Sequence, residues 1–328
     1  MFDSINLFFI NVLQWIHGWV GNYGWSVVVF TLLIRLCLLP LDIKSRRGMY
    51  AMNRIQPKLQ ELQKKYANDK DKLNRKTMEL YKKEHVSMTA GCLPLLLQWP
   101  ILIFMFTAMR VFANEQTIQM LLDMKNGLEP ALQSWLWIKN VFQPDSFMSK
   151  ILPAVGDQLQ AITAVSYSKI LTQENIEAAR TFLASSEYAA QAAQYGAEAF
   201  KQIQLNFVFI RPTLTIPTSF ANLFQYANGL FILPLLAGIS QYFMTTVMNG
   251  KQNKQPQAND ATSANAMNSG FMKWFFPIFS IWVCASSNAA FSIYWMAVNI
   301  ISIVQTVVMN KIFERKDQQR AEAELAQK

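Results

Sequence analysis

The sequence predicts an all-α integral membrane protein with five transmembrane helices, a cytoplasmic helical hairpin and an N-terminal interfacial helix. Of its 328 residues, 52% are hydrophobic and only 16% are charged. The charges are unevenly placed, since the run from Trp274 to Asn310 contains no Asp, Glu, Lys or Arg. About 20 helical residues cross the hydrocarbon layer of a membrane, so this run is long enough for two crossings. We place the turn between them at Ser286-Ser287-Asn288, the polar cluster near its middle.

Further apolar stretches predict three spans upstream of that run. The expected segments are an interfacial amphipathic helix (1–18), span 1 (19–41), a cytoplasmic coiled-coil hairpin (42–90), span 2 (91–113), an extracellular loop with a helical insertion (114–228), span 3 (229–248), a cytoplasmic loop (249–270), spans 4 and 5 (271–313) and a cytoplasmic tail (314–328). The first segment has apolar residues at helical spacing and tryptophans near its end, which is typical of a helix lying in the membrane interface. It has no basic n-region, so we do not expect a secretory signal peptide.

The distribution of basic residues predicts the orientation of the spans. Residues 42–85 carry thirteen Lys and Arg against six acids, whereas residues 114–228 carry seven against nine. Loops rich in Lys and Arg stay in the cytoplasm. With five spans, this rule places the N-terminus outside and the C-terminus in the cytoplasm.

The basic loop has the spacing of two antiparallel helices. Apolar residues at steps of three and four predict a coiled-coil seam, which comprises Met52, Ile55, Leu59, Leu62 and Tyr66 and continues with Leu73, Thr77 and Leu80. A polar break at Asn68-Asp69 separates the two helices. The charges of this hairpin fit either a solvated face beside anionic lipid or a docking surface for partners. The loop has no recognisable nucleic-acid-binding module, so we expect no such partner.

Arg35 is the residue that most needs an explanation. It lies inside span 1, nine positions before Lys44, and none of the five spans contains Asp or Glu. A cation at bilayer depth costs at least about 2.5–3.5 kcal/mol. Helical side chains lean toward the N-terminus, which here faces outside, so reaching toward the cytoplasm is disfavoured. We therefore expect Arg35 to lack a carboxylate partner and to lie on the wall of a hydrated cavity.

Polar residues on other spans support such a cavity. Thr31 lies one turn before Arg35, and Gln98 lies in span 2. Span 5 carries a stripe at steps of three and four, which consists of Ser292, Trp295, Asn299, Ser302 and Thr306. The alternative interpretation is that these residues form hydrogen bonds between helices.

Nothing in the sequence indicates catalysis, a metal site or a cofactor. The three cysteines, Cys37, Cys92 and Cys284, all lie in apolar segments, and the two histidines have no ligand spacing around them. A Gly-rich loop for phosphate groups is also missing from the sequence. We therefore expect a protein that is not an enzyme.

Several motifs resemble those of the YidC family of membrane protein insertases. They are Gly21-Asn22-Tyr23-Gly24-Trp25-Ser26, the run from Thr31 through Arg35 to Pro40, Gln56-Pro57-Lys58, the run from Gly91 to Pro100, Leu136-Trp137-Ile138 with Pro144-Asp145, Leu233-Pro234, and Tyr294-Trp295 through Asn299 to Gln305. They follow the family order along nearly the whole chain except the outer insertion. The form resembled is the Gram-positive-like one, which lacks the large N-terminal outer domain.

The resemblance implies a five-span core in a bacterial plasma membrane, with a groove that opens to the cytoplasm and to lipid. In the family, the arginine of span 1 receives hydrophilic parts of a substrate, and Arg35 occupies that position. The resemblance likewise assigns groove positions to Thr31 and Tyr294, with Trp295 beside them. It implies nascent membrane proteins as partners in the lipid bilayer and a Sec translocon as a candidate partner.

Three features depart from the family pattern. Roughly eighty residues are inserted between Asp145 and Gly229, of which Thr172 to Lys201 are Ala- and Glu-rich and predict helix capped by Thr172. The outer turn lacks the usual Pro-Gly. The tail from Lys311 has five basic residues against four acids, which gives weak support to ribosome contact.

Two other classes of protein remain open on this sequence. A solute transporter or channel would use Arg35 as an anion site, although the sequence shows no internal repeat. A structural scaffold would need no wet cavity.

Overall fold

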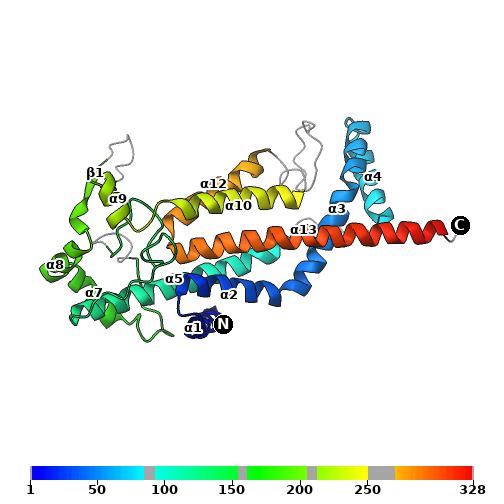
Figure 1. The fold of residues 1–328 in the computed structure, drawn as a ribbon. Helices are drawn as coiled ribbons and strands as arrows, with labels where there is room; N and C mark the ends of the chain where they lie inside the picture. Colours follow the sequence, from blue (N-terminus) through cyan, green and yellow to red (C-terminus); the bar gives the residue numbers. More distant parts are fainter. Residues whose placement is uncertain (1, 85–92, 154–160, 205–212, 250–269, 327–328) are drawn as a thin grey trace. The chain divides into compact units, whose positions relative to one another are not determined.

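Helices make up most of the structure, as the long apolar segments predict (Figure 1). The computed structural model describes residues 2–84, 93–153, 161–204, 213–249 and 270–326. Its longer helices are α1 (Phe2–Val20), α2 (Tyr23–Cys37), α3 (Leu39–Lys65), α4 (Lys70–Lys83), α5 (Leu93–Lys125), α10 (Ile232–Asn249), α12 (Gly270–Ser286) and α13 (Ala289–Ala326). Most of the predicted cytoplasmic loop 249–270 lies outside the described residues.

The structure supports fewer unbroken spans than the five predicted. Among the described residues, α13 is the helix both long and apolar enough to cross a membrane, over Ala289–Gln319. The helices α2 and α3 meet this criterion only as a pair, and they are bent by 64°. The apolar parts of α10 and α12, Ile232–Met248 and Lys273–Ser286, are shorter. The number of spans therefore stays a prediction.

The predicted outer insertion is only partly helical, so the all-α prediction is wrong in this segment. Thr172 does cap a helix, because its Oγ1 accepts a hydrogen bond of 3.2 Å from the Asn175 amide. The helix is then broken into α7 (Gln173–Leu183), α8 (Ser186–Gln194) and a short 3₁₀ turn, η2 (Ala197–Ala199). After it, β1 (Phe200–Gln204) and β2 (Thr213–Pro217) pair antiparallel, and α9 (Phe220–Tyr226) follows. The β-branched residues of β2 explain why it is extended.

The described residues form two compact units, each of which we describe by itself. The first comprises residues 1–32, 103–239 and 277–297, and the second comprises 33–102, 240–276 and 298–328. In the first unit, α1 buries Ile10, Leu13 and Ile16 and exposes Trp15 and Trp19. An exposed aromatic face is what an interfacial helix needs, but its place in the membrane stays a prediction.

In the first unit, a buried carboxylate accepts hydrogen bonds from backbone amides at the start of α10. Asp145 is fully buried, and its Oδ1 accepts hydrogen bonds from the amides of Leu230 (2.8 Å) and Phe231 (3.2 Å). Its Oδ2 accepts from the amide of Leu233 (2.6 Å) and from Trp137 Nε1 (3.2 Å). These donors include backbone N–H groups at the start of α10, which have no partner within that helix. Asp145 thus fixes where the helix starts.

Close packing of α10 against α12 yields a first prediction. A methyl group at Gly238 would lie 2.4 Å from Cγ1 of Ile281 and 3.1 Å from the carbonyl oxygen of Pro277. We expect Gly238→Ala to lower the free energy of unfolding by about 1–3 kcal/mol, because the two helices must move apart. Thermal unfolding in detergent measures this change. Gly18→Ala is the matched control, since no atom lies within 4 Å of its added methyl group; equal effects of the two substitutions would contradict the prediction.

In the second unit, α3 and α4 form an antiparallel hairpin (Figure 1). Ile55 and Tyr81 are buried between them, and Met52 packs against this pair. The predicted break is confirmed, because Asp69 Oδ1 accepts a hydrogen bond of 3.0 Å from the Lys72 amide and so caps α4. The predicted seam is wrong at its end, where Tyr81 rather than Leu80 is the buried residue.

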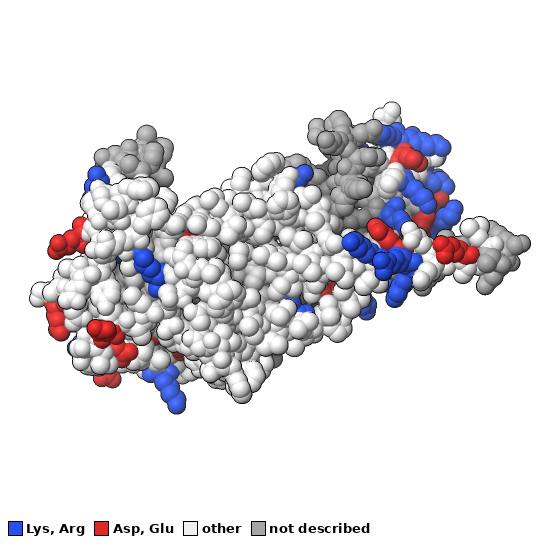
Figure 2. Space-filling view, in the orientation of Figure 1, with Lys and Arg blue, Asp and Glu red and all other residues white. Residues whose placement is uncertain are grey.

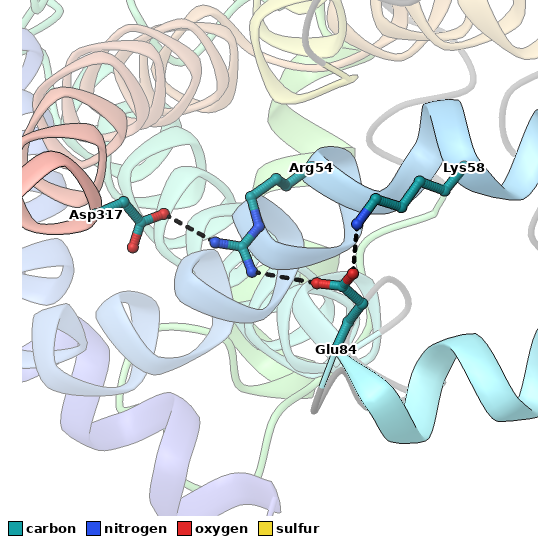
Figure 3. A network of polar contacts seen from close by, with 4 residues as sticks. All are labelled: Arg54, Lys58, Glu84 and Asp317. Carbon is teal, nitrogen blue, oxygen red and sulfur yellow. Dashed lines mark hydrogen bonds and ion pairs between the residues drawn. The ribbon is translucent and has the colours of Figure 1, made fainter. Parts of the chain in front are cut away.

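Charged side chains gather over this hairpin and the C-terminal part of α13 (Figure 2). Four of them form a network (Figure 3). Glu84 lies 2.5 Å from Lys58 Nζ and 3.6 Å from Arg54 Nη2, and Arg54 Nη1 lies 3.2 Å from Asp317 of α13. The network therefore connects α3, the end of α4 and α13.

This network predicts that the hairpin loosens in acid. The hydrogen bond from Lys58 lowers the pKa of Glu84 below its ordinary value of 4.5. A lowered pKa means that Glu84 stabilises the fold above that value and loses this contribution as the pH falls through the folded-state pKa. We expect amide hydrogen exchange of α3 and α4, corrected for its intrinsic pH dependence, to be faster at pH 4 than at pH 7. In Glu84→Gln this difference should be smaller; an unchanged difference would assign it to other groups.

Candidate functional site

Arg35 has a carboxylate partner, contrary to the sequence prediction. Its residue is only 6% exposed, in the last turn of α2, and its Nη1 lies 3.6 Å from Oδ2 of Asp42. The prediction was wrong because Asp42 lies just beyond the end of span 1, outside the segments in which a partner was expected. Arg35 is thus a buried cation with a built-in anion nearby.

The Arg35 side chain reaches toward the C-terminal side of its helix, which the sequence analysis disfavoured. Asp42 is seven residues further on, which is roughly 10 Å along a straight helix at about 1.5 Å per residue. The chain is bent by 64° between α2 and α3, at Leu38, and Pro40 lies in the first turn of α3. The helical direction therefore changes between the two charged residues.

A second buried guanidinium belongs to Arg46 of α3. It is 7% exposed, and it donates a hydrogen bond from Nη1 to Thr306 Oγ1 and one of 3.5 Å from Nη2 to Gln305 Oε1. Burial lowers the pKa of Arg46, the Asp42 carboxylate raises it, and the charge of Arg35 lowers it. Asp42 therefore lies in the electrostatic field of two cations.

Sequence reasoning missed Arg46 because it was counted among the exposed charges of the cytoplasmic loop. A signal was nevertheless present. Arg35, Asp42 and Arg46 are separated by seven and four residues, which is the spacing of one helix face. Continuing the face beyond the end of the span would have found both Asp42 and Arg46.

The part of the α13 polar stripe that belongs to the second unit is buried. Asn299 is 4% exposed, and its Nδ2 donates a hydrogen bond of 3.1 Å to Ser240 Oγ of α10. Ser302 is fully buried, and its Oγ has no hydrogen-bond partner within the described structure. Thr306 donates to the Ser302 carbonyl and accepts from Arg46. The stripe thus supplies both a contact between helices and a partner for the second guanidinium.

The other predicted site residues belong to the first unit or fall outside the description. Thr31 and Tyr294 are buried in the first unit, and the Thr31 hydroxyl donates to the Val27 carbonyl at 2.7 Å. Trp295 is half-buried there, and its Nε1 has no hydrogen-bond partner among the described residues. The side chain of Gln98 lies outside the described residues. The predicted groove residues thus belong to different units, and the groove itself stays a prediction.

A cavity in the first unit involves none of the predicted residues. It measures about 290 Å³, and its lining includes Arg110, Asn114, Thr117 and Asn288. The site best supported by charge and burial is instead the cluster of Arg35, Asp42 and Arg46, which we call the arginine cluster. Arginine stays protonated at all relevant pH values, so this cluster fits the binding of anions rather than proton transfer.

Comparisons with known proteins agree with the motifs. The family model described as "60Kd inner membrane protein" matches residues 15–190 and 181–317. The chain is 37% identical over 156 residues to "Membrane protein insertase YidC" of Fusobacterium nucleatum, covering 48% of this chain and 67% of that protein. It is 38% identical over 172 residues to the protein of the same name from Clostridium tetani, covering 48% and 71%. With that from Thioalkalivibrio sulfidiphilus it shares 44% identity over 95 residues, or 29% and 17% of the two chains.

Proposed function

Because the chain belongs to the YidC family of membrane protein insertases, we propose that it carries hydrophilic segments of nascent membrane proteins through a hydrated groove and releases their hydrophobic helices to lipid. The groove would open to the cytoplasm. Members of this family are insertases in a membrane and not enzymes, in agreement with the expectation from the sequence.

The observation that carries the proposal is the buried cationic cluster at the bend between the apolar helix α2 and the charged helix α3. Arg35 and Arg46 are each less than a tenth exposed, with Asp42 as the acid beside Arg35. A cation in a medium less polar than water attracts a carboxylate more strongly than it would in bulk solvent. An acidic segment of a client therefore gains attraction as it leaves the cytoplasm.

The apolar part of a client needs no motor to enter the bilayer. Burial of each CH₂ group contributes about 0.8 kcal/mol, so a helix of some twenty apolar residues partitions into lipid once its polar flank has crossed. We infer five spans, with the N-terminus outside and the C-terminus in the cytoplasm of a bacterium. The proposed groove residues are Arg35, Thr31, Gln98, Tyr294, Trp295, Asn299 and Ser302.

The proposal is tested with the full chain reconstituted in phospholipid vesicles. A single-span client with a short acidic tail is added, and protection of the tail from protease reports its transfer. We expect protection in vesicles that contain the protein and background levels in empty vesicles. Equal protection in both would overturn the proposal.

Labelling of the introduced thiol in an Arg35→Cys variant, with the native cysteines replaced, separates the alternatives. The insertase proposal requires a membrane-impermeant maleimide to react from the cytoplasmic side only. Reaction from either side in turn would favour a transporter, and full protection would favour a scaffold.

A further inference from the structure

The ion pair between Arg35 and Asp42 has a geometry unlike that of a permanent buried pair. Its N–O distance is 3.6 Å, whereas charge-assisted hydrogen bonds between nitrogen and oxygen measure about 2.7–2.9 Å. The Asp42 side chain is only 15% exposed, and its Oδ2 has no hydrogen-bond partner within the described structure. Buried carboxylates are normally hydrogen-bonded. The carboxylate is therefore close enough to Arg35 for attraction, but it is not fixed by a short hydrogen bond at this oxygen.

Arg46 is held differently from Asp42. Its two terminal nitrogens donate to Thr306 and Gln305 of α13, so its guanidinium is attached to a second helix. Ser45 and Ser302, whose hydroxyl groups are buried without a hydrogen-bond partner within the described residues, come from the same two helices. The arginine cluster thus contains two cations and one acid, with spare polar groups on the helices that carry them.

We propose that Asp42 is an internal competitor for the carboxylates of client proteins, and that it sets how acidic a client segment must be to engage Arg35. The inference rests on the proposed function and names the chemistry of the client at the same site. A client carboxylate binds by displacing that of Asp42 from Arg35, with no covalent step. Asp42 is a positioning residue, since it acts on the client through Arg35.

Competition of this kind makes insertion depend on the number of acids in the tail of the client. A neutral tail gains nothing from Arg35 and leaves the ion pair intact. A tail with one acid must displace Asp42, whereas a tail with several acids has a higher local concentration of carboxylates and displaces it more readily. The protein would therefore discriminate against weakly acidic segments.

The test measures how insertion depends on the charge of the tail. Clients that differ only in having zero, one or three Asp in the tail are added to vesicles with wild-type protein or with Asp42→Asn. We expect Asp42→Asn to lower the half-saturating concentration of the one-Asp client roughly fivefold, the size of a modest ion pair. The ratio between the half-saturating concentrations of the one-Asp and the neutral client should therefore fall in Asp42→Asn. Asp71→Asn, which makes the same charge change at an exposed position of α4, should behave as wild type.

Two further variants keep the test valid if Asp42→Asn folds poorly. Asp42→Glu keeps the acid and should keep the wild-type charge dependence. Arg35→Gln/Asp42→Asn removes both charges without changing their sum, and it should insert all three clients alike. If Asp42→Asn changes insertion of neutral and acidic clients by the same factor, Asp42 has a merely structural role and the inference is wrong. Failure of wild-type protein to insert any client would instead overturn the proposed function itself.

Discussion

Arg35→Ala is expected to lower the insertion of clients with acidic tails at least about tenfold, because removing one partner of a buried charge interaction costs roughly 2 kcal/mol or more. Insertion of clients with neutral tails should change much less. Arg35→Lys should keep most of the activity, since the positive charge remains at the same depth. The measurement is the initial rate of tail protection in vesicles with equal amounts of folded protein.

A second variant is needed as a control, because the structure places Asp42 beside Arg35. Arg35→Ala also leaves the Asp42 carboxylate without its nearest cation, and this alone could disturb the fold. Arg35→Ala/Asp42→Asn removes the stranded charge, so it should restore stability but not the insertion of acidic tails. If Arg35→Ala inserts several acid-tailed clients as well as wild type does, Arg35 has no electrostatic role.

The local features of the fold were predictable because they depend on neighbouring residues. The break at Asn68-Asp69 and the cap at Thr172 each need only a short polar side chain and a free amide two or three residues later. Neither depends on a distant part of the chain.

Two features that sequence reasoning missed depend on distant partners. Strand β1 is extended because it pairs with β2. The residues before it are rich in Ala and Glu, and this composition predicted that the helix would continue to Lys201. Arg46 is buried because Thr306 and Gln305, some 260 positions later, accept its hydrogen bonds. The Arg35–Asp42 pair was missed for a local reason instead, because Asp42 lies just beyond the end of the predicted span 1.

Asp145→Ala is expected to be among the most destabilising single substitutions in the first unit. It removes a buried acceptor from three backbone amides and from Trp137 Nε1. Leaving one buried and three partly buried donors without their acceptor should lower the free energy of unfolding by about 3–5 kcal/mol. The turn it holds is also strained, since Phe231 adopts a φ of 65°, which non-glycine residues rarely take. Thermal unfolding in detergent should show a fall of several degrees.

Two different substitutions at Asp145 distinguish hydrogen bonding by the carboxylate from simple packing. Asp145→Asn has nearly the same shape and keeps one acceptor oxygen, so it should lose about half as much stability as Asp145→Ala. Glu174→Ala, at an exposed acid of α7, should have little effect. Because the cap fixes the start of α10, proteolysis near Leu230 should increase in Asp145→Ala before the hairpin of α3 and α4 is cleaved. If cleavage begins in the hairpin instead, the carboxylate is not what holds this end of α10.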